Sequence, residues 1–73
     1  MKFTDLELFK KAAREMCASV DEDASTGLST ACDEEGFVGL FQYNHITDRG
    51  KGVLFATNAE FEEWETRTNG VIR

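Results

Sequence analysis

Few side chains in this sequence are of the types that catalyse reactions. His45 is the only histidine, and it lies in a polar stretch near Tyr43 and Asp48. Nucleophilic or acid–base catalysis needs such a base held against a nucleophile and oriented by a third group. The chain has no G-x-S-x-G, no glycine-rich phosphate loop and no H-E-x-x-H motif. We therefore expect a solvated imidazole at His45 and no enzymatic activity.

Side chains that bind metal ions are scattered along the chain. Cys17, Cys32 and His45 lack the paired spacing of a zinc site. The stretch that starts at Asp21 has the first acidic spacings of a calcium-binding EF-hand loop, but Thr26 replaces its glycine and Cys32 its bidentate glutamate. The sequence predicts no cofactor and no metal. We expect both cysteines to be free thiols, buried or half-buried, because a lone disulfide is unusual in a reducing compartment.

Negative charge is the most distinctive property of the chain. Fourteen acidic and eight basic residues give a formal net charge of −6, which disfavours direct binding to nucleic acid or anionic membranes. The acidic residues form three groups: Asp21, Glu22 and Asp23; Asp33, Glu34 and Glu35; and Glu60, Glu62, Glu63 and Glu65. Each can be an ordinary solvated surface. If the groups converge, they would suit a basic groove that normally holds DNA or RNA.

The N-terminal segment has the pattern of an amphipathic helix over about residues 4–19. Residues 4–7 (TDLE) have the spacing of a capping box that begins at Thr4, and Phe3 and Leu8 can pack together as a hydrophobic staple around it. Apolar residues then recur at helical spacing as far as Val20, with charged residues largely outside that stripe. This charged pattern is unlike a signal peptide, and no apolar run is long enough to span a bilayer, so we expect a cytoplasmic protein.

The middle of the chain has strand composition. Residues 37–43 and 53–56 are rich in aromatic and β-branched residues, and the glycines between them predict an antiparallel hairpin. Residues 21–36 are ambiguous: alternation of Leu28, Thr30 and Cys32 favours a weak strand, while residues 25–36 also fit a short capped helix.

A second helix follows the hairpin. Residues 57–60 (TNAE) form another capping box, Phe61 and Trp64 share a helical face, and Asn69-Gly70 is a left-handed stop signal. The shared face favours a core position for Trp64 over an interface position. We predict one α+β domain over residues 1–73, in the order α-β-β-β-α, with both helices on one face of a small antiparallel sheet.

Two known classes of protein share features with this chain. Helix, three strands, helix is the order of double-stranded-RNA-binding domains, but these grip phosphates with lysines where this last helix carries glutamates. In size, acidity, strong capping and lack of cofactor motifs, the chain resembles the small inhibitor proteins that phages make against host machinery, including anti-CRISPR proteins and RNA-polymerase inhibitors. The resemblance implies a non-enzymatic inhibitor of a nucleic-acid-handling complex, but it assigns no residues.

The candidate partner-binding residues come from charge and side-chain type. Acidic residues would supply charge complementarity, and Tyr43 and Arg49 are of the types that anchor interfaces. The full set is Asp33, Glu34, Glu35, Tyr43, Arg49, Glu60, Glu62 and Glu63. The alternative is an assembly module that uses its sheet edge to bind another copy or a larger subunit. An antitoxin-like neutraliser of a basic partner fits the sequence equally well, as do a monomer and a homodimer.

Overall fold

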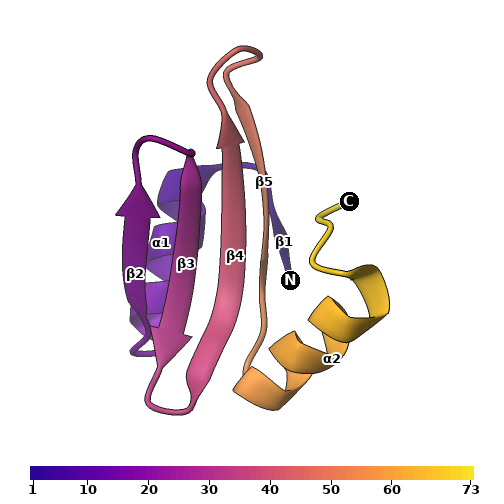
Figure 1. The fold of residues 1–73 in the computed structure, drawn as a ribbon. Helices are drawn as coiled ribbons and strands as arrows, with labels where there is room; N and C mark the ends of the chain where they lie inside the picture. The colour runs from indigo at the N-terminus through magenta and orange to yellow at the C-terminus, as the bar shows by residue number, and fades with distance from the viewer.

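The computed structural model describes residues 1–73 as one sheet with a helix on each side (Figure 1). The strands form one antiparallel sheet in the order β1-β5-β4-β3-β2. In chain order the elements are β1 (Lys2–Phe3), α1 (Leu6–Glu15), β2 (Ser19–Asp23), β3 (Leu28–Asp33), β4 (Gly36–Asn44), β5 (Arg49–Leu54) and α2 (Asn58–Thr68). The predicted α+β class, the antiparallel hairpin and the strand around residues 28–32 are confirmed, whereas β1 and β2 are additions to the predicted order. The second strand of the hairpin is misplaced in the prediction: it spans residues 49–54 instead of 53–56, so Gly50 and Gly52 lie in β5 and not in the turn.

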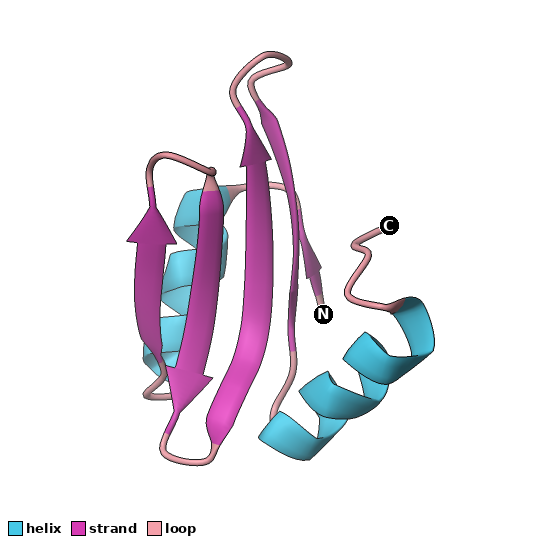
Figure 2. Ribbon diagram, in the orientation of Figure 1, coloured by secondary structure: helices cyan, strands magenta, loops and turns pink.

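The two helices lie on opposite faces of the sheet, so the prediction that both cover one face is wrong. Neighbouring residues of a strand point to opposite faces. In β5, Leu54 packs in a cluster with Phe9 of α1, and Val53 packs in a second cluster with Phe61 of α2. Figure 2 shows α1 behind β2 and β3, with α2 well apart from it. Two covers are needed because Val53 and Leu54, which point to opposite sides of β5, are both buried.

A β-bulge in β4 adjusts which side chains meet which helix. Ala31 pairs with Gly39 while Cys32 pairs with Phe37, so Val38 is the extra residue. Val38 is fully buried in the cluster on the α1 side. Phe37 lies on the α2 side, where its ring centroid is 6.4 Å from that of Phe61.

Helix α1 is shorter than predicted at both ends. Its N-cap is Asp5, whose carboxylate accepts hydrogen bonds from the backbone N–H groups of Glu7 and Leu8 at 2.8 and 3.2 Å. The predicted capping box at Thr4 is therefore wrong, because pairing of β1 with β5 holds the preceding residues in an extended strand. At the other end, the chain leaves the helix through Cys17 in a left-handed conformation and enters β2.

Helix α2 follows the sequence signals closely. The hydroxyl of Thr57 accepts a hydrogen bond from the backbone N–H of Glu60 at 3.2 Å, which confirms Thr57 as the N-cap and one half of the predicted capping box. Asn69 and Gly70 both have positive φ angles, which confirms the stop signal. Trp64 is only 7% exposed, so its predicted core position is also confirmed.

The cluster on the α1 side depends on glycines in β5. The ring of Phe41 lies directly over Gly50 and Gly52, and a Cβ atom at either glycine would overlap ring carbons. Phe41 is 1% exposed, and its ring centroid is 5.5 Å from that of Phe9. The Phe41 ring therefore packs directly against the glycine backbone of β5 on this side of the sheet.

Candidate functional site

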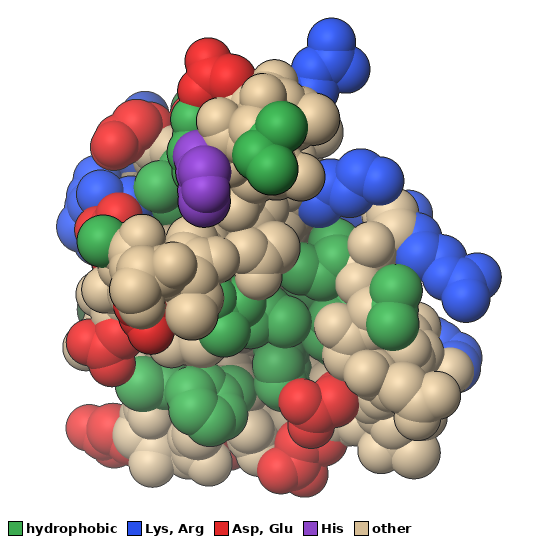
Figure 3. Space-filling model, turned by 45° about the horizontal axis from the view of Figure 1, so that its top comes forward, with side chains coloured by type: hydrophobic (Ala, Val, Ile, Leu, Met, Phe, Trp, Pro, Cys, Tyr) green, Lys and Arg blue, Asp and Glu red, His purple; other side chains and the backbone are tan.

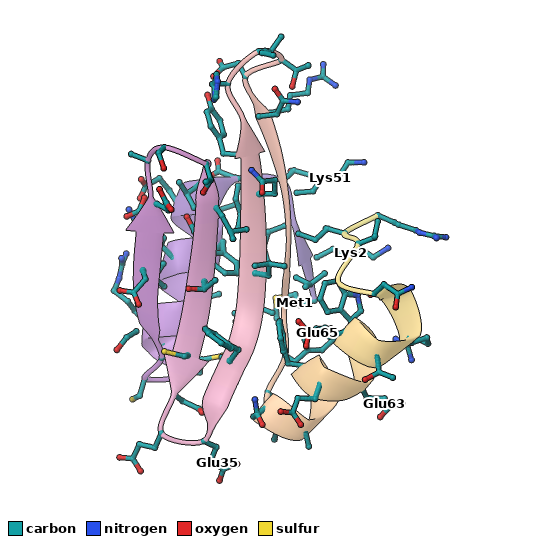
Figure 4. All side chains as sticks on the ribbon, viewed as in Figure 1. Met1, Lys2, Glu35, Lys51, Glu63 and Glu65 are labelled. Carbon is teal, nitrogen blue, oxygen red and sulfur yellow. The ribbon has the colours of Figure 1, made fainter.

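Two of the three acidic groups lie at the same end of the sheet. The side-chain amide of Asn58, the first residue of α2, donates a hydrogen bond to the carbonyl oxygen of Phe37 at 2.8 Å. The same amide lies against Gly36, where φ is +135° and a Cβ atom would clash. This contact holds the β3–β4 turn beside the start of α2, and Figure 4 shows Glu35 at that turn and Glu63 on the outside of α2. We call the combined surface the acidic end: Asp33, Glu34, Glu35, Glu60, Glu62 and Glu63.

Most carboxylates of the acidic end have no cationic neighbour. Only Glu63 forms an ion pair, with Arg67 at 3.8 Å, and both side chains are well exposed. Two of the acidic residues also have structural roles. The carboxylate of Asp33 accepts a hydrogen bond from the backbone N–H of Glu35 at 2.9 Å, which orders the turn, and Glu60 lies in the first turn of α2, where negative charge is favourable.

The third acidic group is not part of this surface. Glu22 forms an ion pair with Lys10 of α1 at 3.1 Å, and this contact raises the pKa of Lys10. Asp23 accepts hydrogen bonds from the hydroxyl and backbone N–H of Ser25, which hold the pKa of Asp23 below its usual value. Because the β2–β3 and β3–β4 turns lie at opposite ends of β3, the three groups do not all converge.

Tyr43 and Arg49 also lie away from the acidic end. They belong to the far end of the β4–β5 hairpin, whereas the acidic turn precedes the start of β4. Tyr43 packs against the cluster on the α1 side, and its hydroxyl donates a hydrogen bond to the carboxylate of Asp48, which raises the pKa of Tyr43. The structure therefore divides the predicted partner-binding residues between two ends of the sheet.

A depression on the α2 side of the sheet was not predicted. It has a volume of about 1170 Å³ and extends across β3, β4 and β5 to the C-terminal segment. Figure 3 shows apolar side chains gathered on this hollowed face, with basic side chains along one side. The lining residues are Thr4, Leu28, Leu40, Gln42, Asn44, Thr47, Asp48, Arg49, Gly50, Lys51, Gly70 and Ile72. The sequence signal that could have indicated this face is the spacing of Arg49 and Lys51, which places two basic side chains on the same side of a strand.

The two cysteines and the single histidine differ in exposure. Both cysteines are free; Cys32 is half-buried as expected, but Cys17 is exposed because α1 ends before it. His45 is exposed in the hairpin turn, and no group of three or more His, Cys, Asp or Glu side chains has an arrangement that could hold a metal ion. Neither helix combines the length and apolarity needed to cross a bilayer.

Comparison with known proteins finds no matching family model, no matching curated protein and no matching solved structure. The function of the protein therefore has to be inferred from its own surfaces.

Proposed function

We propose that this protein is a non-catalytic inhibitor whose acidic end binds a basic, nucleic-acid-binding groove on a protein complex. The observation that supports this proposal is the acidic end itself. Six carboxylates from two distant parts of the sequence lie at one end of the molecule, and only one of them has a cationic partner within 4 Å.

Charge of this kind acts on the rate and specificity of binding. Exposed carboxylates grouped on one surface attract a basic patch over about one Debye length, which is ~8 Å at physiological salt. A groove that normally holds phosphates would have that complementary charge, and occupation by this protein would exclude DNA or RNA. A CRISPR effector or an RNA polymerase is the class of target that the resemblance to small phage inhibitors favours.

The direct test is capture of partners from a lysate of the host, with the purified protein immobilised at low salt. The expected result is recovery of a nucleic-acid-binding complex that added DNA or RNA displaces and that elutes as salt is raised. The double variant Glu35→Lys/Glu62→Lys should lose this complex, because it reverses two unpaired charges at the acidic end.

A matched control separates a specific surface from net charge. Glu15→Lys/Asp21→Lys makes the same change, from −6 to −2, at exposed residues elsewhere. Retention of the complex by this control and its loss from the acidic-end variant would support the proposal. Equal loss from both variants, or loss from neither, would contradict it.

The sheet edges bear on the alternative of an assembly module. Strand β2 has no neighbour on its outer side, so it is an open edge. It carries Asp21, Glu22 and Asp23, and charged side chains on an edge oppose pairing with a second copy. Sedimentation at low and high salt checks this: a self-association that persists or strengthens in high salt would favour the assembly module over the inhibitor.

A further inference from the structure

The two faces of the sheet are covered to different extents. On the α1 side, Phe9 and Ala13 are fully buried against residues from β3, β4 and β5. On the α2 side, the buried cluster comprises only Val53, Phe61 and Trp64, with Leu40, Phe55 and Ile72 packed against it. The depression lies on this less covered face, between the sheet and the C-terminal segment. Part of the sheet surface is therefore accessible to another molecule.

The lining of the depression combines apolar and basic groups. Leu28, Leu40 and Ile72 are each half-buried and contribute its apolar surface. Arg49 and Lys51 alternate with Val53 along β5, so all three point to the α2 side. Both basic residues are exposed in this strand.

The positive charge on this face is not neutralised within the protein. Arg49, Lys51 and Lys2 have no carboxylate within 4 Å, although acidic residues outnumber basic ones by fourteen to eight. Lys2 lies opposite Val53 in the sheet, and Figure 4 shows Lys2 and Lys51 extending to the same side. Asp48, the only acidic residue in the lining, accepts a hydrogen bond from Tyr43.

We infer that this depression binds an acidic, apolar peptide segment of a protein partner. Apolar side chains of the segment would contact Leu28, Leu40 and Ile72, and its carboxylates would pair with Arg49 and Lys51. These two basic residues are two apart in a strand, about 6.6 Å, so acidic residues two apart in an extended peptide would match them.

Size and charge distinguish a peptide from other anionic ligands. A volume of about 1170 Å³ exceeds the ~300–1000 Å³ of ordinary small-molecule pockets, and the depression is open on the sheet surface. A polyanion such as DNA or RNA would be repelled by the net charge of −6. A short segment with a few carboxylates makes the favourable contacts and avoids most of that repulsion.

The test is a selection from a phage-displayed library of random 12-residue peptides. Binders to the immobilised variant Arg49→Glu/Lys51→Glu are removed first, and the remainder are selected on the wild-type protein. The expected result is enrichment of peptides that combine Asp or Glu with Leu, Ile or Phe. Failure to enrich peptides, or enrichment of basic ones, would overturn the inference.

Synthetic copies of the enriched peptides then give affinities by fluorescence anisotropy. Arg49→Glu/Lys51→Glu should weaken binding at least about tenfold, because it places like charges against the peptide. The control Lys11→Glu/Arg14→Glu makes the same charge change on α1, on the other side of the sheet, and should leave affinity unchanged. Equal weakening by both variants would show non-specific charge attraction and would overturn the inference.

Two further measurements check the fold of the variants and the chemical class of the ligand. Circular dichroism and Trp64 fluorescence verify that each variant is folded, and Leu28→Glu should also weaken binding by disrupting the apolar surface. Titrations with dodecanoate and with a single-stranded DNA 12-mer provide other anionic ligands. If either binds the depression as tightly as the peptides do, the assignment to a peptide is wrong. The acidic-end variant Glu35→Lys/Glu62→Lys should bind the peptides normally, so this inference and the proposed function can fail separately.

Discussion

Substitution of Gly52 by alanine tests how the cluster on the α1 side is built. A Cβ atom at this position would overlap the ring of Phe41 and lie 3.0 Å from the carbonyl oxygen of Leu40. The ring cannot move freely, because Phe41 is 1% exposed and packs against Phe9. Overpacking of this kind costs about 1–3 kcal/mol, and two close contacts place Gly52→Ala in the upper half of that range, ~2–3 kcal/mol.

This cost is a large share of the stability of such a small domain. A core of this size leaves only ~3–5 kcal/mol of net stability. Each kcal/mol lowers the Tm of a 60–100-residue domain by roughly 4–8 °C, so Gly52→Ala should lower it by about 10–20 °C. Urea unfolding followed by the fluorescence of Trp64, the only tryptophan, measures the free energy of unfolding directly.

A double-mutant cycle isolates the contact between the ring and the glycine. Phe41→Leu removes the ring that alanine at position 52 would overlap, so adding Gly52→Ala to that background should cost less than about 1 kcal/mol. A loss below ~0.5 kcal/mol for Gly52→Ala alone, or the same loss with and without Phe41, would refute overpacking against the ring as the cause.

Two further predictions concern local contacts. Asp5→Ala should lower the free energy of unfolding by about 1 kcal/mol, as expected for loss of an N-cap, and Thr4→Ala should change it little. Denaturant unfolding of both variants measures this, and a larger loss for Thr4→Ala than for Asp5→Ala would show that Thr4 is the N-cap. Tyr43, the only tyrosine, should titrate above its ordinary pKa of 10.0 in absorbance at 295 nm, and Asp48→Asn should bring the midpoint down, since the bond to Asp48 stabilises the protonated phenol. Because this pKa is raised in the folded state, the contribution of the bond to stability is present at neutral pH and is lost as pH rises through the raised pKa. An unchanged titration midpoint of Tyr43 in Asp48→Asn would contradict this account.

Local signals in the sequence were sufficient for β4 and for α2. The aromatic and β-branched run of β4, the cap at Thr57 and the stop at Asn69 all act within a few residues of their own positions. By contrast, the first four residues of β5 (RGKG) lack such a signal, and they are extended because they pair with β4. Strand β2 (SVDED) also has little strand propensity and is extended because it pairs with β3. The short pairing of β1 with β5 depends in the same way on contacts between distant parts of the chain.

The positions of the helices and of the acidic groups could not be predicted from local patterns. The unbroken run Val53-Leu54-Phe55 was a hint that both sides of β5 are buried, but it does not say which helix covers which side. The acidic end depends on contacts between distant parts of the chain: Phe61 and Trp64 pack α2 on the sheet, and Asn58 donates a hydrogen bond to Phe37 near the start of β4. The sequence lists the acidic residues, and the fold shows which groups of them lie near each other.

Separation of the apolar residues into two clusters gives the molecule two units that can open independently. If α2 leaves the sheet, Val53, Phe61 and Trp64 become exposed, but the cluster around Phe9 and Phe41 stays intact. Such partial opening requires less free energy than global unfolding. The acidic end includes part of α2. A partner bound there would therefore stabilise the packing of this helix on the sheet against local opening.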